Sequence, residues 1–517
     1  MGQSRSFIHT CAVIVATLLG LSAALGFAQD EMLVVALPGE AQTLDMQITT
    51  AEVAGSISSH WLETLVAFDA NWTPQPHLAA SVDVSDDGLV YTFNLRQGIT
   101  FHDGQSLVAG DVIASLNRWM EVSPRGRSVQ PYAVDLVASD DATVVLTLSA
   151  PFAPILSLLA HHSGGAGIYP ASVIEAAGSE PIQDHIGTGP YEFVAWLPDR
   201  YVEVKRYEGY VPVDAPSDGY AGERVAHYET IRFATVPEVA TRVAGTQTGE
   251  YGVAWQISPD LYPMLSTDMS VESVVRKPFI WPVAFFNKRE GLMTNQTLRQ
   301  AVVAALDMEE LLIAGAGLPE FYNLDHNYMV SDTPFETDAG LQAYNQNDPV
   351  LAAALAADAG YAGETIRWLT SPDYNQHYQL SLAAEQQLEE AGFDIEVIAV
   401  EWGTLLDLRA QPDQWDIFVT HHGFAPDPVL LNTLSPTYPG WWEVDPNREV
   451  LVDQLHTATS LDARQAAWEE LMAYNWEYLP SIMFGEWYGL SVKSPSVDLG
   501  AAALQGMPSY WNSRPGN

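Results

Sequence analysis

Two stretches of the chain alternate between short apolar segments and segments with helical periodicity. In the first, residues 231–234 form a short apolar strand, Pro237 suits the opening turn of a helix that runs to about Thr246, and residues 251–255 form the next strand. Strand, helix and strand in succession are typical of a parallel sheet covered by helices. This stretch therefore predicts one α/β lobe.

The second stretch lies far along the chain and repeats the same alternation. Its longest helical segment carries Leu380, Ala384 and Leu388 on one face and ends at Gly392, because glycine readily adopts the left-handed turn that closes a helix. The expected elements are a strand at 365–369, this helix, a strand at 395–399, a short helix at 405–408 and a strand at 416–420. We therefore expect a second α/β lobe.

Residues 66–184 have a different pattern. Strand-like alternation at 90–95 and 143–148 is separated by turn signals, and one helix is expected around 111–120. This part of the chain predicts a mixed subdomain inserted in the first lobe.

The first residues read as an export signal. One cation, Arg5, precedes an apolar run at 11–28 that ends in Gly26-Phe27-Ala28, with small residues where a signal peptidase cuts. An uncleaved membrane anchor is the alternative, since about 18 apolar residues are near the minimum for a bilayer. No cationic flank follows the run, so we expect cleavage near Ala28.

Composition narrows the possible partners. With 517 residues, 47% of them apolar, the chain can fill more than one core. It carries 22 basic and 65 acidic residues, a net charge of −43, which argues against nucleic acid and anionic lipid as partners. The acidic surface suits saline surroundings or reflects ordinary drift in an exported protein. The one cysteine, Cys11, lies in the expected signal peptide, so the mature chain has no thiol chemistry.

Several short motifs occur in a characteristic order. They are Pro76-His77-Leu78-Ala79, the run 87–96, Phe101-His102-Asp103-Gly104 followed by Asp111-Val112, Gly187-Thr188-Gly189-Pro190-Tyr191, Leu298-Arg299-Gln300-Ala301 with Ala305-Leu306-Asp307, and Asp427-Pro428. In this order and spacing the chain resembles, over its mature length, the extracellular solute-binding proteins of the peptide and nickel class, solute-binding family 5, which serve ABC importers.

The resemblance implies an α/β fold, a two-lobed periplasmic-binding-protein clamshell joined by crossing strands, with an extra mixed α+β subdomain in the first lobe. It also implies a periplasmic monomer that works with an ABC permease and ATPase complex and needs no cofactor. The expected parts are the signal peptide at 1–28, the first lobe at 29–65, 185–276 and 487–517, the inserted subdomain at 66–184 and the second lobe at 277–486.

Ligands of open α/β sheets bind beyond the carboxyl ends of the strands. In the first lobe this rule selects Trp255 and Gln256. In the second lobe it selects Trp402 after the strand at 395–399, and the loop at 421–428 after the strand at 416–420. The candidates in that loop are His421, His422, Phe424 and Asp427. Trp281, next to an expected strand at 283–286, is a further candidate for the cleft or a core residue.

The loop at 421–428 departs from the dipeptide- and oligopeptide-binding members. There an acidic residue pairs with the ligand's free amine, and Phe424 stands at that position here. Asp427 either takes over this role or caps the next helix, and Phe424 either stacks on cargo or packs in the core. Adjacent histidines on a strand point to opposite faces, so neither His161-His162 nor His421-His422 easily holds one metal ion. We expect no metal site.

These observations predict a binding protein for peptides or peptide-like solutes and not an enzyme. A binding protein for a different cargo, such as an oligosaccharide, an opine-like conjugate or a nickel chelate, is the alternative, because members of this class differ in cargo while sharing the fold. An exported hydrolase is a second alternative. This chain, however, contains no Gly-x-Ser-x-Gly elbow, no His-Glu-x-x-His pair and no cysteine in its expected mature part.

Overall fold

The computed structural model describes residues 32–329, 333–434, 440–442, 444–500 and 508–516. The predicted signal peptide at 1–28 lies outside these residues. In the described part of the chain, no helix combines the length and apolarity that a membrane crossing requires.

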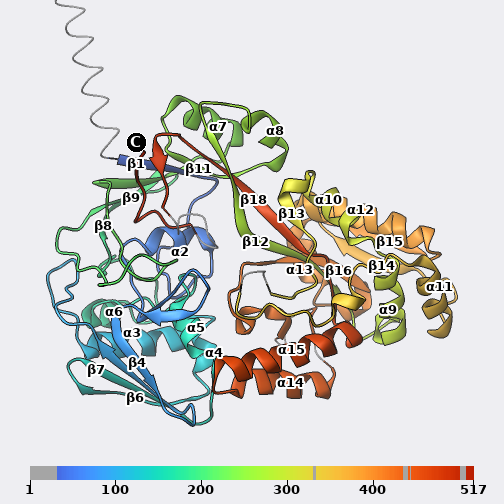
Figure 1. Cartoon of the computed structure of the whole chain (residues 1–517), viewed down its shortest axis with the longest axis horizontal. Coiled ribbons are helices and arrows are strands. Elements are labelled where there is room, and N and C mark those ends of the chain that lie inside the picture. The colour runs from blue at the N-terminus through green and yellow to red at the C-terminus, as the bar shows by residue number, and fades with distance from the viewer. Residues whose placement is uncertain (1–31, 330–332, 435–439, 443, 501–507, 517) are drawn as a thin grey trace, which may run out of the picture.

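One sheet of 12 strands runs through the molecule (Figure 1). Its main path is, in order, β15 (Ile395–Ala399), β14 (Ile366–Thr370), β16 (Ile417–Gly423), β12 (Glu272–Phe286), β18 (Glu486–Lys493), β11 (Val253–Ile257), β1 (Met32–Leu37), β10 (Thr230–Thr235), β9 (Tyr201–Arg206) and β8 (Tyr191–Leu197). Two short strands lie off this path, β13 (Tyr322–Asn323) against β18 and β17 (Ser481–Met483) against β12.

The sheet contains two parallel units. Strand β1 pairs in parallel with β10 and β11 in the first lobe, and β14 pairs in parallel with β15 and β16 in the second. Strands β12 and β18 pair antiparallel with each other and cross between the units, as Figure 1 shows. The predicted two-lobed α/β fold with crossing strands is therefore confirmed.

Helices cover the faces of both units, with apolar faces and capping residues at the positions that the sequence predicts. The second-lobe helix α12 (Asn375–Glu390) buries Leu380, Ala384 and Leu388 against the sheet. Asp307 caps the helix α10 by accepting from the amides of Glu309 and Glu310. The remaining second-lobe helices are α9 (Gln296–Ala304), α10 (Met308–Ala316), α11 (Pro349–Asp358), α13 (Trp402–Leu408), α14 (Pro446–Thr457) and α15 (Leu461–Tyr478).

The first lobe carries a separate antiparallel sheet in the order β4-β5-β7-β6. In Figure 1 this sheet lies below the main sheet, and α14 and α15 of the second lobe approach it from the side. Its strands are β4 (Ala79–Val84), β5 (Val90–Leu95), β6 (Ala133–Asp140) and β7 (Thr143–Leu148). Two further pairs of short strands are separate from it, β2 (Val66–Phe68) with β3 (Pro74–Pro76) and β19 (Val497–Asp498) with β20 (Arg514–Pro515). The first-lobe helices are α2 (Glu52–Ser58), α3 (Ala109–Val122), α4 (Gly126–Val129), α5 (Ile155–Ala160), α6 (Ala171–Ala177), α7 (Val239–Thr248) and α8 (Tyr262–Leu265).

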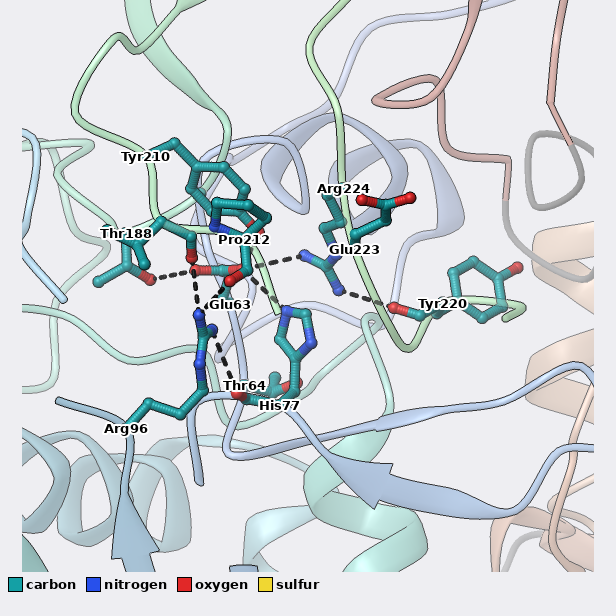
Figure 2. A network of polar contacts seen from close by, with 12 residues as sticks. Glu63, Thr64, His77, Arg96, Thr188, Tyr210, Pro212, Tyr220, Glu223 and Arg224 are labelled. Atoms are coloured by element: carbon teal, nitrogen blue, oxygen red, sulfur yellow. Dashed lines mark hydrogen bonds and ion pairs between the residues drawn. The ribbon is translucent and has the colours of Figure 1, made fainter. Parts of the chain in front are cut away.

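A buried polar network holds distant first-lobe segments together (Figure 2). The carboxylate of Glu63 accepts hydrogen bonds from His77 Nε2 at 2.8 Å, Tyr210 Oη at 2.9 Å and Thr188 Oγ1 at 2.8 Å. The guanidinium of Arg224 lies 3.9 Å from the same carboxylate. Two of the motifs that carry the family resemblance contribute to this network, through His77 and Thr188.

Two strands are longer than the pattern predicts. Strand β16 continues past Thr420 to Gly423, because it pairs with β12 in a register that joins Gly423 to Ile280. Strand β12 begins at Glu272, so Trp281 lies inside a strand and not beside one. Both extensions come from pairing partners that are distant in sequence, which local periodicity does not report.

Candidate functional site

Two adjoining cavities lie between the lobes, with volumes of about 390 and 550 Å³. Both are lined by Glu52 at the start of α2, by Arg276, Phe279 and Ile280 on β12, and by Gly423 at the end of β16. The crossing strand β12 thus forms a common wall. A register shift between Arg276 and Ile280 in its pairing with β18 turns these side chains toward the cavities.

Arg125 supplies a positive charge to the smaller cavity. It precedes α4, and its Nε donates to the carbonyl of Ser163 at 2.5 Å. Burial lowers the pKa of Arg125 to about 10, so the side chain remains charged at pH 7. Among the described residues, no carboxylate forms an ion pair with it. A partly buried cation without a counter-ion favours an anionic ligand group.

Apolar and aromatic side chains form the rest of the smaller cavity. Leu158 and Val429 contribute aliphatic walls, and His422 and Phe424 come from β16 and the loop after it. The ring of Phe424 packs on Trp72 of the first lobe with 4.3 Å between centroids. Phe424 therefore contacts both lobes and also faces the cavity.

The larger cavity takes its residues from both lobes. Trp255 and Gln256 come from β11 of the first lobe, Tyr374 and His421 from the second lobe, and Tyr488 from the crossing strand β18. Gln256 has φ of +49°, and the pairing of β11 with β18 shifts register at this position. The left-handed backbone interrupts the ladder and leaves the Gln256 side chain exposed at the cavity.

Arg276 lies between the two cavities. Its guanidinium forms an ion pair with Glu52 and lies 5.3 Å from the ring centroid of Trp255 and 4.8 Å from that of Phe279. Burial lowers the pKa of Arg276 to about 9. The two rings and the carboxylate compensate part of the cost of burying this charge.

Five of the eight predicted site residues line these cavities, namely Trp255, Gln256, His421, His422 and Phe424. Trp255 and His422 line different cavities, and the two cavities share the wall formed by β12.

The other three predicted site residues line neither cavity. Trp281 is 1% exposed within the core, because β12 turns it away from the cleft. Trp402 packs on Tyr374 with 4.8 Å between ring centroids and so stands behind a cavity residue. Asp427 caps the short helix η6 (Pro428–Leu430), and both its oxygens accept from Arg464 at 2.8 Å. Of the two roles considered for Asp427, the structure shows the helix cap.

No group of three or more potential metal ligands occurs among the residues that the structure describes. His421 and His422 line different cavities, as expected for neighbours on a strand. Burial lowers the pKa of His421 to about 4 and that of His422 to about 3, so both rings are neutral at pH 7.

The pattern analysis missed Arg125, Arg276, Phe279 and Tyr374. Arg125 lies between two helices and Arg276 in the middle of a crossing strand, so the strand-end rule does not select them. Tyr374 lies in the loop after the predicted strand at 365–369, so the rule could have selected it. One signal was present in the composition. With only 22 basic residues in a strongly acidic chain, a cation in a largely apolar segment such as 271–286 is a candidate for a specific role.

Comparisons with known proteins agree with this architecture. The model of the bacterial extracellular solute-binding proteins, family 5, matches residues 73–440. A probable peptide ABC transporter periplasmic-binding protein of Sinorhizobium fredii is 27% identical over 484 residues, covering 90% of each chain. The glutathione-binding protein GsiB of Escherichia coli K12 is 28% identical over 408 residues, covering 78% of this chain and 75% of that protein.

Solved structures show the same fold at lower identity. NikA from Brucella suis, in complex with Fe(III)-EDTA, has a TM-score of 0.79 at 20% identity, covering 94% of this chain and 100% of that one. The dipeptide-binding protein of Pseudoalteromonas sp. SM9913, in complex with Met-Leu, has a TM-score of 0.73 at 21% identity with the same coverage. On the match to residues 73–440 and on the two-lobed architecture, the chain belongs to the bacterial extracellular solute-binding proteins of family 5.

Proposed function

We propose that this protein is the solute-binding component of an ABC importer and captures short peptides or peptide-like solutes that carry a carboxylate. It encloses the solute between its lobes and delivers it to the membrane permease. The observation that carries the proposal is Arg125, a cavity-lining cation that forms no ion pair with any described carboxylate.

The chemistry of the cleft favours a carboxylate over a free amine as the anchoring group. Glu52 is the one acidic side chain among the described residues that line the two cavities, and Arg276 already pairs with it. By the family resemblance, Phe424 stands at the position of the amine-binding acid of the dipeptide- and oligopeptide-binding members, and Asp427 is held by Arg464. A ligand carboxylate at Arg125 would instead gain a charge-assisted hydrogen bond.

The size and lining of the cavities also suit a short peptide. Volumes of 390 and 550 Å³ lie within the range of about 300–1,000 Å³ that small-molecule sites occupy. Apolar walls at Leu158, Phe279 and Val429 would hold side chains, and Gln256 and Tyr374 would contact the backbone. Names of the similar proteins point the same way, since they include peptide-, dipeptide- and glutathione-binding proteins.

We further propose that the solute leaves chemically unchanged and that the chain acts outside the cytoplasm after cleavage near Ala28. The divisions at 66–184 and 277–486 serve as the inserted subdomain and the second lobe of this cycle. Incubation with a peptide library followed by mass spectrometry tests the first point, because cleavage products from pure protein would show an enzyme. N-terminal sequencing of the exported chain tests the second.

The central experiment is a thermal-shift screen with glutathione, Met-Leu, longer peptides, oligosaccharides and nickel–histidine, since a ligand that binds only the folded state raises Tm. We expect Met-Leu or glutathione to raise it, and C-terminally amidated Met-Leu to raise it less. R125M should weaken binding of the free acid about tenfold to a hundredfold.

The matched control is R127M. Arg127 lies two residues away on α4, exposed to solvent, and its change should leave binding intact. Equal binding of amidated and free Met-Leu, or a response to oligosaccharides alone, would overturn the proposal.

A further inference from the structure

A pair of histidines lies at the wall of the larger cavity. Nδ1 of His421 on β16 is 3.1 Å from Nε2 of His377 on α12. His421 lines the cavity, whereas His377 lies behind it with no exposed surface. This contact uses one nitrogen of His421 and leaves its Nε2 as the ring nitrogen available to a bound solute.

Both rings are neutral at pH 7. Burial lowers the pKa of His377 to about 3 and that of His421 to about 4, and each ring therefore carries one N–H. A single proton lies between Nδ1 of His421 and Nε2 of His377, and its owner decides what His421 presents to the cavity. If His377 donates, Nε2 of His421 is an N–H donor, and if His421 donates, its Nε2 is an acceptor.

The surroundings of His377 decide between these arrangements. Its Nδ1 is buried and makes no hydrogen bond within the described part of the chain. If Nε2 of His377 accepted, this Nδ1 would carry a buried N–H without an acceptor, an arrangement that folded proteins avoid.

Neighbouring aromatic rings offer that N–H no substitute acceptor. Trp487 stacks on His377 with 20° between the ring planes, and Tyr374 is tilted by 31°. An N–H in the plane of the imidazole would not point at the face of either ring. The indole N–H of Trp487 is itself bound to the carbonyl of Leu312.

We infer that His377 donates its Nε2 proton to His421 and thereby fixes His421 as an N–H donor aimed at solute oxygen atoms in the larger cavity. His377 is a positioning residue, and His421 selects for a carbonyl or carboxylate oxygen at its end of the cleft. This inference deepens the proposed function and rests on it for the identity of the solute class.

The tautomer is measured directly by ¹⁵N–¹H correlation spectra of the full mature protein labelled at histidine, without any solute. H421Q removes one ring and assigns the signals. We expect His421 to be protonated at Nε2 and unprotonated at Nδ1. A proton at Nδ1 of His421 in the unaltered protein would overturn the inference.

Two substitutions of His377 separate positioning from packing. H377Q keeps an N–H donor near the position of Nε2 and should preserve the His421 tautomer. H377M fills the space without a donor and should give a mixture of tautomers. If H377M does not fold, the spectra of the unaltered protein and of H377Q still decide the matter.

Binding is then measured by calorimetry with glutathione and Met-Leu. H421F should weaken the tighter of the two about tenfold, as expected for one lost hydrogen bond, and H421Q should weaken it less. Unchanged binding by H421F would overturn the donor role. Failure of both probes to bind the unaltered protein would count against the proposed solute class, whereas the tautomer spectra would still report on the histidine pair.

Discussion

Glu63 and Asp427 are both buried carboxylates paired with arginine, and they differ in what they join. All the partners of Glu63 belong to the first lobe, as Figure 2 shows. Asp427 is held by Arg464 within the second lobe, but its Oδ2 also accepts from Ser157 Oγ of the first lobe at 2.6 Å.

Other contacts surround the Ser157 bond. The amide of Ala153 donates to the carbonyl of His456 at 2.9 Å, and the rings of Phe152 and His456 lie 5.8 Å apart. These contacts join the segment 152–157 of the first lobe to α14 and to the Asp427–Arg464 pair of the second lobe. We call Ser157, Asp427 and Arg464 the rim cluster.

Contacts within one lobe and contacts between the lobes should contribute to different properties of the protein. Parting of the lobes should leave the Glu63 network intact, because all its members belong to the first lobe. The same motion breaks the Ser157–Asp427 bond and leaves the Asp427–Arg464 pair in place. The Glu63 network should therefore determine unfolding, and the rim cluster should contribute both to unfolding and to closure on a solute.

The largest expected effect is that of E63Q. Removal of this charge leaves Arg224 buried without its counter-ion, which should lower the free energy of unfolding by about 3–5 kcal/mol. Urea unfolding followed by circular dichroism measures the loss. The exposed E175Q serves as the control and should change stability little. A loss below about 1 kcal/mol for E63Q would contradict a central role for the network.

Acidification should weaken the Glu63 network before it weakens the Asp427 carboxylate. Burial and the charge of Arg224 lower the pKa of His77 from 6.5 to about 4. The unfolded chain therefore binds more protons between these values, and stability falls as pH drops from 6.5 toward 4. For Asp427, burial opposes the shift but Arg464 lowers the pKa below 3.8, so its contribution is lost only at lower pH.

H77Q isolates this titration. It retains an N–H donor toward Glu63 without a titrating ring, and should remove on the order of 3 kcal/mol of the loss between pH 7 and pH 4. Urea unfolding across this pH range gives the measurement. An unchanged pH profile in H77Q would place the titration elsewhere.

D427N comes next in magnitude. It weakens the bidentate pair with Arg464 while keeping the helix cap, and should cost about 2 kcal/mol in unfolding. Oδ2 of Asp427 accepts from both Arg464 and Ser157 Oγ of the first lobe. D427N should therefore also reduce the affinity for whichever solute binds. A variant that loses affinity but no stability would assign Asp427 to closure alone.

S157A should have the smallest and most selective effect. It removes one hydrogen bond that joins the two lobes, so solute affinity should fall by about 1 kcal/mol. Unfolding of the solute-free protein should change less. The exposed S149A on the same subdomain is the control. Equal losses with and without solute would show that the rim is closed in both states.

Sequence patterns anticipated the elements better than the contacts between them. Strands β10, β14 and β15 and helix α12 follow from periodicity and turn residues in a single segment. Strand ends selected Trp255 and His421, which line the larger cavity. Arg125 and the rim cluster require segments that lie far apart in the chain to meet, as Ser157 and Asp427 do. Local patterns contain no such pairing. The sequence around Asp427 therefore fits a ligand-binding role and a helix cap equally well, and only the contact with Arg464, 37 residues away, separates them.

The position of Arg276, Phe279 and Ile280 on β12 has a practical consequence for redesign. These side chains touch the solute space and also belong to a strand that links the lobes, so substitutions here would alter selectivity and the opening equilibrium together. Gln256 lies where the pairing of β11 is interrupted, whereas Phe424 also packs on Trp72 of the other lobe. A sensor with a new specificity is best begun from Gln256, with Phe424 and the β12 wall left as they are.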